Sequence, residues 1–344
     1  MWNPQRTVHA AGRTGTHAGV GALRRLERKI GLRAGQAVFV YGTLLLTLAF
    51  MACFTFFPMA WGAAISFFRY SAVRTGEHFL GLGGNNPFIG LGHYATMVSD
   101  APDGVHFRQQ LLTSILFAFL ALPLNLAITL PLAVLVESVA GRLKTLFRAI
   151  YFMPTLTSTV AVALMWQFIY HPQQGVLNVL VKAIGLTPPR SWLSDPAAIV
   201  MGVPLALLCI MIAHVWQEFG YNLIIFIAGL QGIPDELRQA ARIDGAGAWH
   251  EFWRITLPLL RPTMLFVCVM TLLSALQAFA IFNVMLPDRG PTVDQTTPLV
   301  LAIYNNAFRY QVLGWGAAMS MVLFFLTLSL TIGQMRLLRT EWEY

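Results

Sequence analysis

The stretch QAARIDGAGAWHEFWRITLPLLRP, from Gln239 to Pro262, interrupts an otherwise apolar chain. It carries five charged residues, two internal glycines and two prolines. The residues on both sides of it are apolar enough to lie in a lipid bilayer. Because a bundle of lipid-facing helices does not require such a polar segment, its presence points to a function outside the bilayer.

The composition of the whole chain is typical of an integral membrane protein. Of its 344 residues, 56% are hydrophobic and 11% are charged, whereas a soluble domain usually carries about 25% charged residues. The mean hydropathy of +0.62 agrees. The three cysteines lie in apolar runs, and neither HExxH nor G-x-x-x-x-G-K-[ST] occurs. We therefore expect no metal site, no catalytic site and no phosphate-binding loop on this chain.

Six apolar runs are long enough to cross the bilayer, whose hydrocarbon core of about 30 Å takes roughly 20 helical residues. They predict an all-α polytopic membrane protein with six transmembrane helices. The fourth run is too long for one straight span, so we expect a bend at Gly220, and Pro154 and Pro204 are candidate kinks. The runs are Val38–Trp61, Leu111–Val136, Ala149–Tyr170, Ala197–Leu230, Thr263–Met285 and Gly314–Gln334.

The distribution of positive charge predicts the orientation. Most of the 23 lysines and arginines lie in the N-terminal tail, between the second and third runs, between the fourth and fifth runs, and at the C-terminus. Because cytoplasmic loops are enriched in Lys and Arg, both termini and the quoted segment should be cytoplasmic. The resulting division is a basic tail at 1–37 with an amphipathic helix over Gly21–Arg33 (alternatively a disordered tail), a first span at 38–61, an external loop at 62–110, a core at 111–334 and a C-terminal tail at 335–344.

The quoted segment and the residues before it have the pattern of two short helices around a turn. Pro234 suits a first helical position, and the acidic residues after it favour the helix dipole. Gly245 can adopt the backbone angles that end a helix, and Ala248–Ile255 carries aromatic residues at helical spacing. Such a unit can bind another protein through its aromatic residues. Alternatively, it is a loop whose tryptophans lie among the lipid headgroups.

The sequence of this segment resembles a motif of a known protein family. The cytoplasmic motif of permease subunits of binding-protein-dependent ABC importers reads E-A-A, three residues, G, nine residues, I-x-L-P. Here the same spacing gives Gln239-Ala240-Ala241, Gly245 and then Ile255-Thr256-Leu257-Pro258. Gln239 stands where the family usually has Glu, so a neutral hydrogen bond could replace an ionic contact with the ATPase.

Other stretches resemble the carbohydrate permeases of the maltose and glycerol-3-phosphate type. PFIGLGHY at Pro87–Tyr94 is similar to the F-x-G-L-x-N-Y that follows the first span in that family. DRGP at Asp288–Pro291, followed by TTPL at Thr296–Leu299, resembles a stretch typical of the F-type member of a permease pair. The resemblance implies the type I ABC importer permease fold in the plasma membrane of a prokaryote. It also implies four kinds of partner: a second permease, two ATPase subunits that bind ATP and Mg, an extracytoplasmic solute-binding protein and a sugar substrate.

The resemblance further implies what the quoted segment does. Residues 232–262 would contain the coupling helix between helices 4 and 5, which transmits closure of the ATPase dimer to the membrane helices. The chain itself would then be a transport subunit without a cofactor, and not an enzyme. The ATPase-coupling residues that follow from the motif are Glu236, Gln239, Ala240, Ala241, Asp244, Gly245, Ile255, Leu257 and Pro258.

Polar residues at bilayer depth are candidates for the solute pathway. Four of them in the fourth run follow the i, i+3, i+4, i+7 spacing of one helix face, and the resemblance places these, with two from the fifth run, at or beside the central cavity. The alternative is a buried polar network that bends and locks the two helices. The six residues are His214, Gln217, Glu218, Tyr221, Thr271 and Gln277.

Two other classes of protein remain open at this point. An ion-coupled secondary transporter would use Glu218 as a proton carrier and should contain inverted repeats, of which the sequence shows no clear second copy. An intramembrane enzyme could use His214 with Glu218 but lacks a Ser/His or Ser/Lys pair. For an importer, the expected solute is a di- or oligosaccharide, then a monosaccharide or polyol, then a glycerol-phosphate-like compound. The Glu218 carboxylate argues mildly against an anionic solute, because like charges repel.

Overall fold

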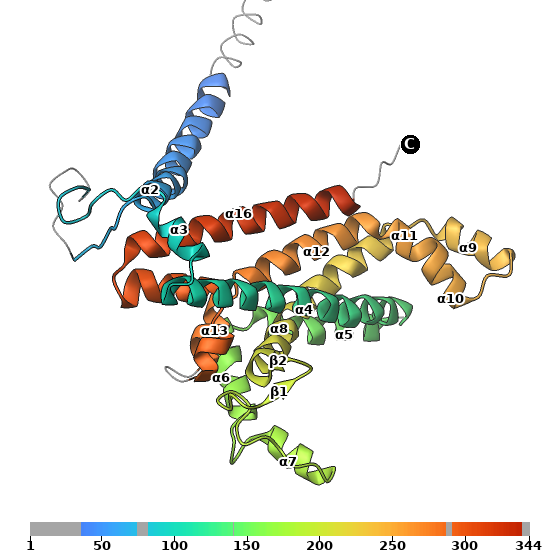
Figure 1. The fold of residues 1–344 in the computed structure, drawn as a ribbon. Helices are drawn as coiled ribbons and strands as arrows, with labels where there is room; N and C mark the ends of the chain where they lie inside the picture. Colours follow the sequence, from blue (N-terminus) through green and yellow to red (C-terminus); the bar gives the residue numbers. More distant parts are fainter. Residues whose placement is uncertain (1–35, 74–81, 140, 287–290, 339–344) are drawn as a thin grey trace, which may run out of the picture. The chain divides into compact units, whose positions relative to one another are not determined.

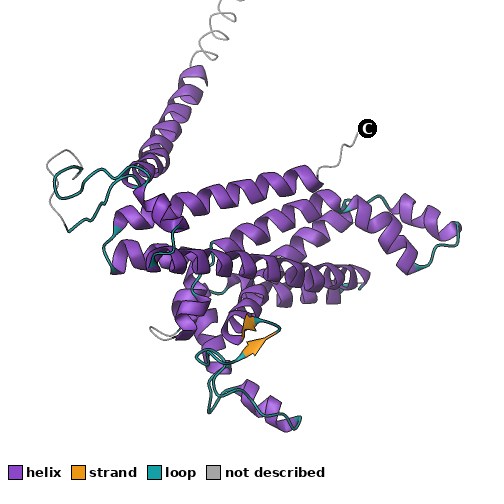
Figure 2. Cartoon of the chain, viewed as in Figure 1, coloured by secondary structure: helices purple, strands orange, loops and turns teal. Residues whose placement is uncertain are grey.

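A computed structural model describes residues 36–73, 82–139, 141–286 and 291–338 of the chain. Nearly all secondary structure in these residues is helical, as Figures 1 and 2 show. The exception is a small antiparallel hairpin of β1 (Ile199–Val200) and β2 (Val203–Pro204). The chain divides into two compact units, Met1–Gly62 and Ala63–Tyr344. The expected amphipathic helix of the basic tail lies outside the described residues.

The first span is a helix that runs from Gln36 to Ile65 and contains the predicted run. It includes a π-helical turn, η1 (Ala52–Phe56), directly before α2 (Phe57–Ile65). Pro58 explains this wide turn, because a proline ring clashes with the carbonyl group four residues earlier in a regular α-helix.

The second span begins earlier than its apolar run predicts. The short helix α3 (Gly92–Val98) precedes α4 (Pro102–Ser138), which starts with Pro102 and Asp103 in its first turn. Both residue types favour a helix N-terminus, since proline needs no hydrogen bond there and the carboxylate meets the positive end of the dipole. The predicted external loop at 62–110 therefore contains α3 and the first turns of α4.

The third span is broken close to Pro154, where a kink was expected. α5 (Arg142–Phe152) passes through a 3-10 turn, η3 (Met153–Leu156), to α6 (Thr159–Ile169), with a bend of 95° between the two helical arms. The short helix α7 (Val176–Ala183) follows.

The fourth span differs from its prediction at both expected irregularities. α8 (Leu205–Gln231) is one continuous helix with no break at Gly220. Pro204 ends the β-hairpin and caps α8 in an extended conformation, so it does not kink the helix. Gly220 serves close packing, because a Cβ atom there would lie 2.2 Å from the backbone oxygen of Tyr151.

The fifth span is interrupted twice. The segment Ala248–Leu259 meets α12 (Arg261–Leu276) at an angle of 69°, and the helix breaks again before α13 (Phe279–Met285). The rest of the chain comprises α14 (Pro291–Thr296), α15 (Leu299–Tyr304), the π-helical turn η5 (Asn305–Arg309) and α16 (Leu313–Leu338). α16 contains the sixth predicted run.

The centre of the second unit is the packing of α4 against α8 and α12 (Figure 1). One apolar cluster contains Phe117, Leu207 and Phe282, and another contains Leu223 and Phe226. Among the described residues, four helices are long and apolar enough to span a membrane, or up to six if each bent pair counts as one span. The protein is thus all-helical, and the upper number equals the predicted six.

Candidate functional site

The candidate coupling segment forms a helical hairpin between α8 and α12 (Figure 1). α9 (Asp235–Ile243) ends in a hydrogen bond from the backbone N–H of Ala246 to the oxygen of Ala241, at 2.9 Å. Gly245 lies between these two residues with a φ of +80°. This is a Schellman motif, in which the residue after the helix is left-handed and glycine is strongly favoured. The predicted turn at Gly245 is confirmed.

The second helix of the hairpin departs from the prediction of one regular helix over Ala248–Ile255. α10 (Ala248–Glu251) leads into a π-helical turn, η4 (Phe252–Thr256), and then into α11 (Leu257–Leu259). Pro258 follows η4 as Pro58 follows η1. In both places the wide turn accommodates the proline ring and the carbonyl group four residues earlier.

The motif residues separate into an outward group and an inward group. The outward residues are exposed on α9 and its turn: Glu236, Gln239, Ala240, Asp244 and Gly245. Ala241 is buried, and the residues at the base of the hairpin, Ile255, Leu257 and Pro258, are partly buried. Only the outward group is free to touch another protein, and the inward group supports the hairpin.

Two exposed tryptophans lie on the second arm. Trp249 and Trp253 expose 73% and 49% of their surface, and their rings meet edge to face at 5.5 Å. Aromatic side chains of this kind are enriched both in protein interfaces and among lipid headgroups, so they fit either interpretation of the segment.

Among the candidate pathway residues, Gln217 is buried and bound within the chain. Its side-chain nitrogen donates to the backbone oxygen of Thr157 at 3.1 Å and to the hydroxyl of Thr159 at 3.0 Å. The Thr155 hydroxyl in turn donates to the backbone oxygen of Gln217 at 3.0 Å. Gln217 therefore fastens α8 to the broken third span.

Thr271 belongs to a second buried network, which joins α4, α8 and α12. The amide nitrogen of Asn222 donates to the Thr271 hydroxyl at 3.0 Å and to the side-chain oxygen of Asn125 at 2.9 Å. Asn125 was missed by sequence reasoning, although an asparagine inside an apolar run is a detectable signal. A buried polar contact between the fourth and fifth spans, as in the alternative that we considered, is present at Thr271, whereas Gln217 binds the third span instead.

His214 is 5% exposed, and its ring lies 5.4 Å from that of Phe117. Its Nε2 atom has no hydrogen-bond partner among the described residues.

The remaining three candidates are accessible. Glu218 is partly exposed, and its carboxyl group accepts a hydrogen bond from Ser274 of α12. Tyr221 is 38% exposed one turn further along α8, and Gln277 is exposed where α12 ends. The single helix face of the prediction thus divides into a buried part and a part that a solute could reach.

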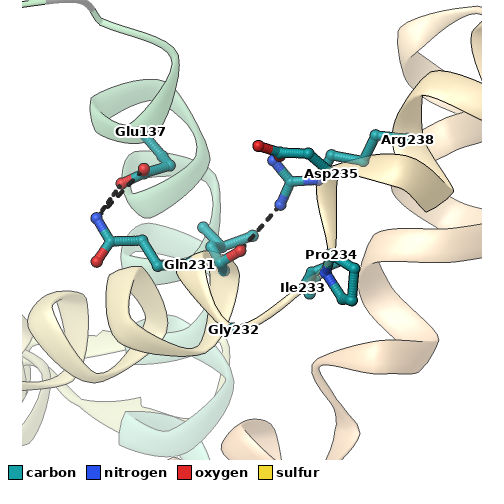
Figure 3. A pocket seen from close by; sticks show the side chains of 8 residues that line it. Glu137, Gln231, Gly232, Ile233, Pro234, Asp235 and Arg238 are labelled. Atoms are coloured by element: carbon teal, nitrogen blue, oxygen red, sulfur yellow. Dashed lines mark hydrogen bonds between the residues drawn. The ribbon is translucent and has the colours of Figure 1, made fainter.

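An ionic cluster near the hairpin was not predicted. Glu137, at the end of α4, pairs with Lys144 and Arg148 of α5, the latter at 2.9 Å. The side chain of Gln231, the last residue of α8, lies 3.4 Å from both carboxylate oxygens (Figure 3). In the sequence Lys144 and Arg148 contribute to the predicted orientation of the chain. The carboxylate that they share belongs to Glu137 of another helix, so the cluster could not be predicted from them.

Comparison with known proteins identifies the family. Residues 109–338 match the family described as binding-protein-dependent transport system inner membrane component. The chain is 32% identical over 294 residues to the probable ABC transporter permease protein YurN of Bacillus subtilis, which covers 84% of this chain and 92% of that protein. It is 30% identical over 285 residues to the sn-glycerol-3-phosphate transport system permease protein UgpA of Agrobacterium fabrum, covering 83% and 90%.

A solved structure agrees in fold. A chain of the bacterial alginate ABC transporter, in complex with an alginate pentasaccharide-bound periplasmic protein, matches with a TM-score of 0.73 at 22% identity, over 90% of this chain and 98% of that chain. With the matched family and the two permease relatives, this identifies the chain as a multi-pass inner-membrane protein of the binding-protein-dependent transport systems, a permease subunit of an ABC importer that is not itself catalytic.

Proposed function

We propose that this chain forms half of the translocation pathway of an ATP-driven sugar importer, as the F-type member of a permease pair. A second permease completes the pathway, two ATPase subunits bind ATP and Mg and dock on the hairpin, and an extracytoplasmic binding protein delivers the solute. Both termini and the hairpin are cytoplasmic in this proposal, as the distribution of Lys and Arg favours.

The observation that carries the proposal is the exposed hairpin of α9 and α10 around Gly245. It combines the importer motif with an outward face that carries both small and polar residues. Small side chains let a partner's backbone approach, while Gln239 offers an amide in place of the usual carboxylate. The contact residues that we propose are the outward ones: Glu236, Gln239, Ala240, Asp244 and Gly245.

The proposed solute pathway rests on Glu218, Tyr221 and Gln277, because these candidates combine polar groups with access. A carboxylate, a phenol and an amide supply the acceptors, donors and aromatic face that a di- or oligosaccharide requires. Glycerol-3-phosphate is the second candidate, since UgpA relatives share about 30% identity with this chain. We assign Gln217, Thr271 and His214 to the buried framework of the pathway.

The test is to purify the chain from its native host in mild detergent and to identify what accompanies it in stoichiometric amount. We expect a second permease and an ATPase subunit, with ATP hydrolysis stimulated by a sugar-loaded binding protein. Stimulation by a glycerol-phosphate-loaded protein would replace the sugar by that solute. A chain that purifies alone, with uptake driven by a proton gradient and not by ATP, would overturn the proposal in favour of ion-coupled transport.

A further inference from the structure

The cluster around Glu137 connects three helices at the root of the hairpin. The Glu137 side chain is 17% exposed and accepts bonds from Lys144 and Arg148 on one side and from Gln231 on the other. The ion pairs hold α5 against the end of α4. The bonds from Gln231 join the carboxylate to the end of α8, and they are long, at 3.4 Å.

A cavity of about 340 Å³ lies between Glu137 and α9, and Figure 3 shows Glu137 and Arg238 on opposite sides of it. Arg238 donates from Nη2 to the backbone oxygen of Leu230 at 3.0 Å. Its Nε atom is buried and has no hydrogen-bond partner among the described residues. Glu137 and Arg238 also line a neighbouring cavity of about 380 Å³, together with Phe252 of the second arm.

Arg238 therefore has a donor without a partner among the described residues, and it lines the same cavity as Glu137, whose bonds toward α8 are long. A guanidinium group has five N–H donors, and a carboxylate has about four acceptor sites. Between α8 and α9 the chain has only Gly232, Ile233 and Pro234, so a small rotation there moves Arg238 relative to Glu137. A bidentate guanidinium is a stronger partner for a carboxylate than an amide at 3.4 Å.

We propose that Glu137 is a positioning residue that transmits movement of the hairpin to α4 and α5. In this structure Gln231 holds Glu137 from one side, as Figure 3 shows, and Lys144 and Arg148 of α5 hold it from the other. When the ATPase displaces α9, Arg238 replaces Gln231 on the carboxylate, so that α9, α4 and α5 move together. The inference rests on the proposed function, because it takes α9 as the element that the ATPase moves.

The experiment compares the transported solute per ATP hydrolysed in proteoliposomes that contain the complete complex. We expect Glu137→Gln and Arg238→Gln each to lower this ratio about tenfold, the effect of one charge-assisted hydrogen bond, while the amount of assembled complex and its ATP hydrolysis persist. The double variant should lower the ratio no further than Glu137→Gln alone, because both lack the contact between Glu137 and Arg238. Glu137→Asp keeps the charge and should give a ratio between those of Glu137→Gln and wild type. The matched control Asp103→Asn, at the other end of α4, should leave the ratio at the wild-type value.

Several outcomes would overturn the inference. One is a wild-type ratio in Glu137→Gln, and another is a double variant whose loss is the product of the two single losses. A loss of assembly in parallel with transport in both single variants would mark the contact as structural. If Glu137→Gln fails to assemble, Arg238→Gln tests the same contact with the α5 ion pairs intact, and a wild-type ratio there overturns it equally. If no ATPase assembles with the wild-type chain, the proposed function fails and this inference fails with it.

Discussion

Gly245 shows how one residue determines the shape of the hairpin that α9 and α10 form. Its φ of +80° lies in the left-handed region, and a Cβ atom there would meet nothing within 4 Å. Replacing Gly245 by any other residue would therefore strain the backbone without causing a steric clash. The restriction is intrinsic to L-residues, which explains why the turn could be predicted from the sequence alone.

We expect Gly245→Ala to weaken ATPase binding about tenfold, because a left-handed backbone costs an L-residue about 1–2 kcal/mol. The measurement is the amount of ATPase that co-purifies over a range of concentrations, with solute uptake in parallel. Gly247→Ala is the matched control. Gly247 has a φ of −72° and open space around its Cα, so this variant should bind nearly as well as wild type. Equal binding by the two variants would show that the turn geometry does not determine docking.

At the scale of elements, the buried asparagines hold α4, α8 and α12 in register. Asn222 donates two hydrogen bonds across helix interfaces. Hydrogen bonds between membrane helices contribute about 0.6 kcal/mol each on average. We expect Asn222→Leu to lower the free energy of unfolding in mixed micelles by about 1 kcal/mol, with transport per assembled complex retained.

Tyr221→Phe is the control for that substitution, because it removes a hydroxyl from an exposed neighbour on the same helix. It should leave the free energy of unfolding unchanged. A variant Asn222→Leu as stable as wild type would argue that the network contributes no net stability.

The helices themselves could largely be predicted from their apolar runs, but their ends and breaks could not. The run that begins at Ala197 includes the β-hairpin, because valine, isoleucine and proline there are as apolar as the helix that follows. The helix is also unbroken at Gly220, where we expected a bend, for a related reason. A glycine in a helix marks either a bend or a close neighbour, and only the packing of Tyr151 against it shows which. The 95° break of the third span did have a local signal in Pro154.

The site was predictable where its determinants are local. The hairpin could be predicted from a contiguous motif. Which of the candidate pathway residues a solute can reach depends instead on their burial in the folded chain. Gln217 and Glu218 are adjacent in sequence, yet one is fastened to Thr159 and the other is partly exposed. The Glu137 cluster draws on three helices, so no spacing within one run reveals it.

At the scale of the whole molecule, the adjacent residues Gln217 and Glu218 offer a test of the proposed solute pathway. We expect Glu218→Ala to raise the solute concentration needed for half-maximal uptake by about 10- to 100-fold, because a hydrogen bond to a charged group contributes about 1.5–3 kcal/mol. Assembly and basal ATP hydrolysis should persist. Gln217→Ala should instead reduce the amount of folded complex, since Thr157 and Thr159 lose their buried partner. The pathway assignment would be wrong if both variants lost only folded protein.

The continuity of α8 has a mechanical consequence for the importer. This helix connects the β-hairpin at one end with the coupling hairpin at the other, over about 40 Å at 1.5 Å per residue. It meets the backbone of α5 at Gly220, which lies nearer to the end that leads into α9. A helix that turned about this contact as a rigid rod would act as a lever with unequal arms, whose longer arm carries the β-hairpin. In the proposed importer, a small push at the hairpin of α9 and α10 would then arrive at the β-hairpin enlarged and reversed in direction.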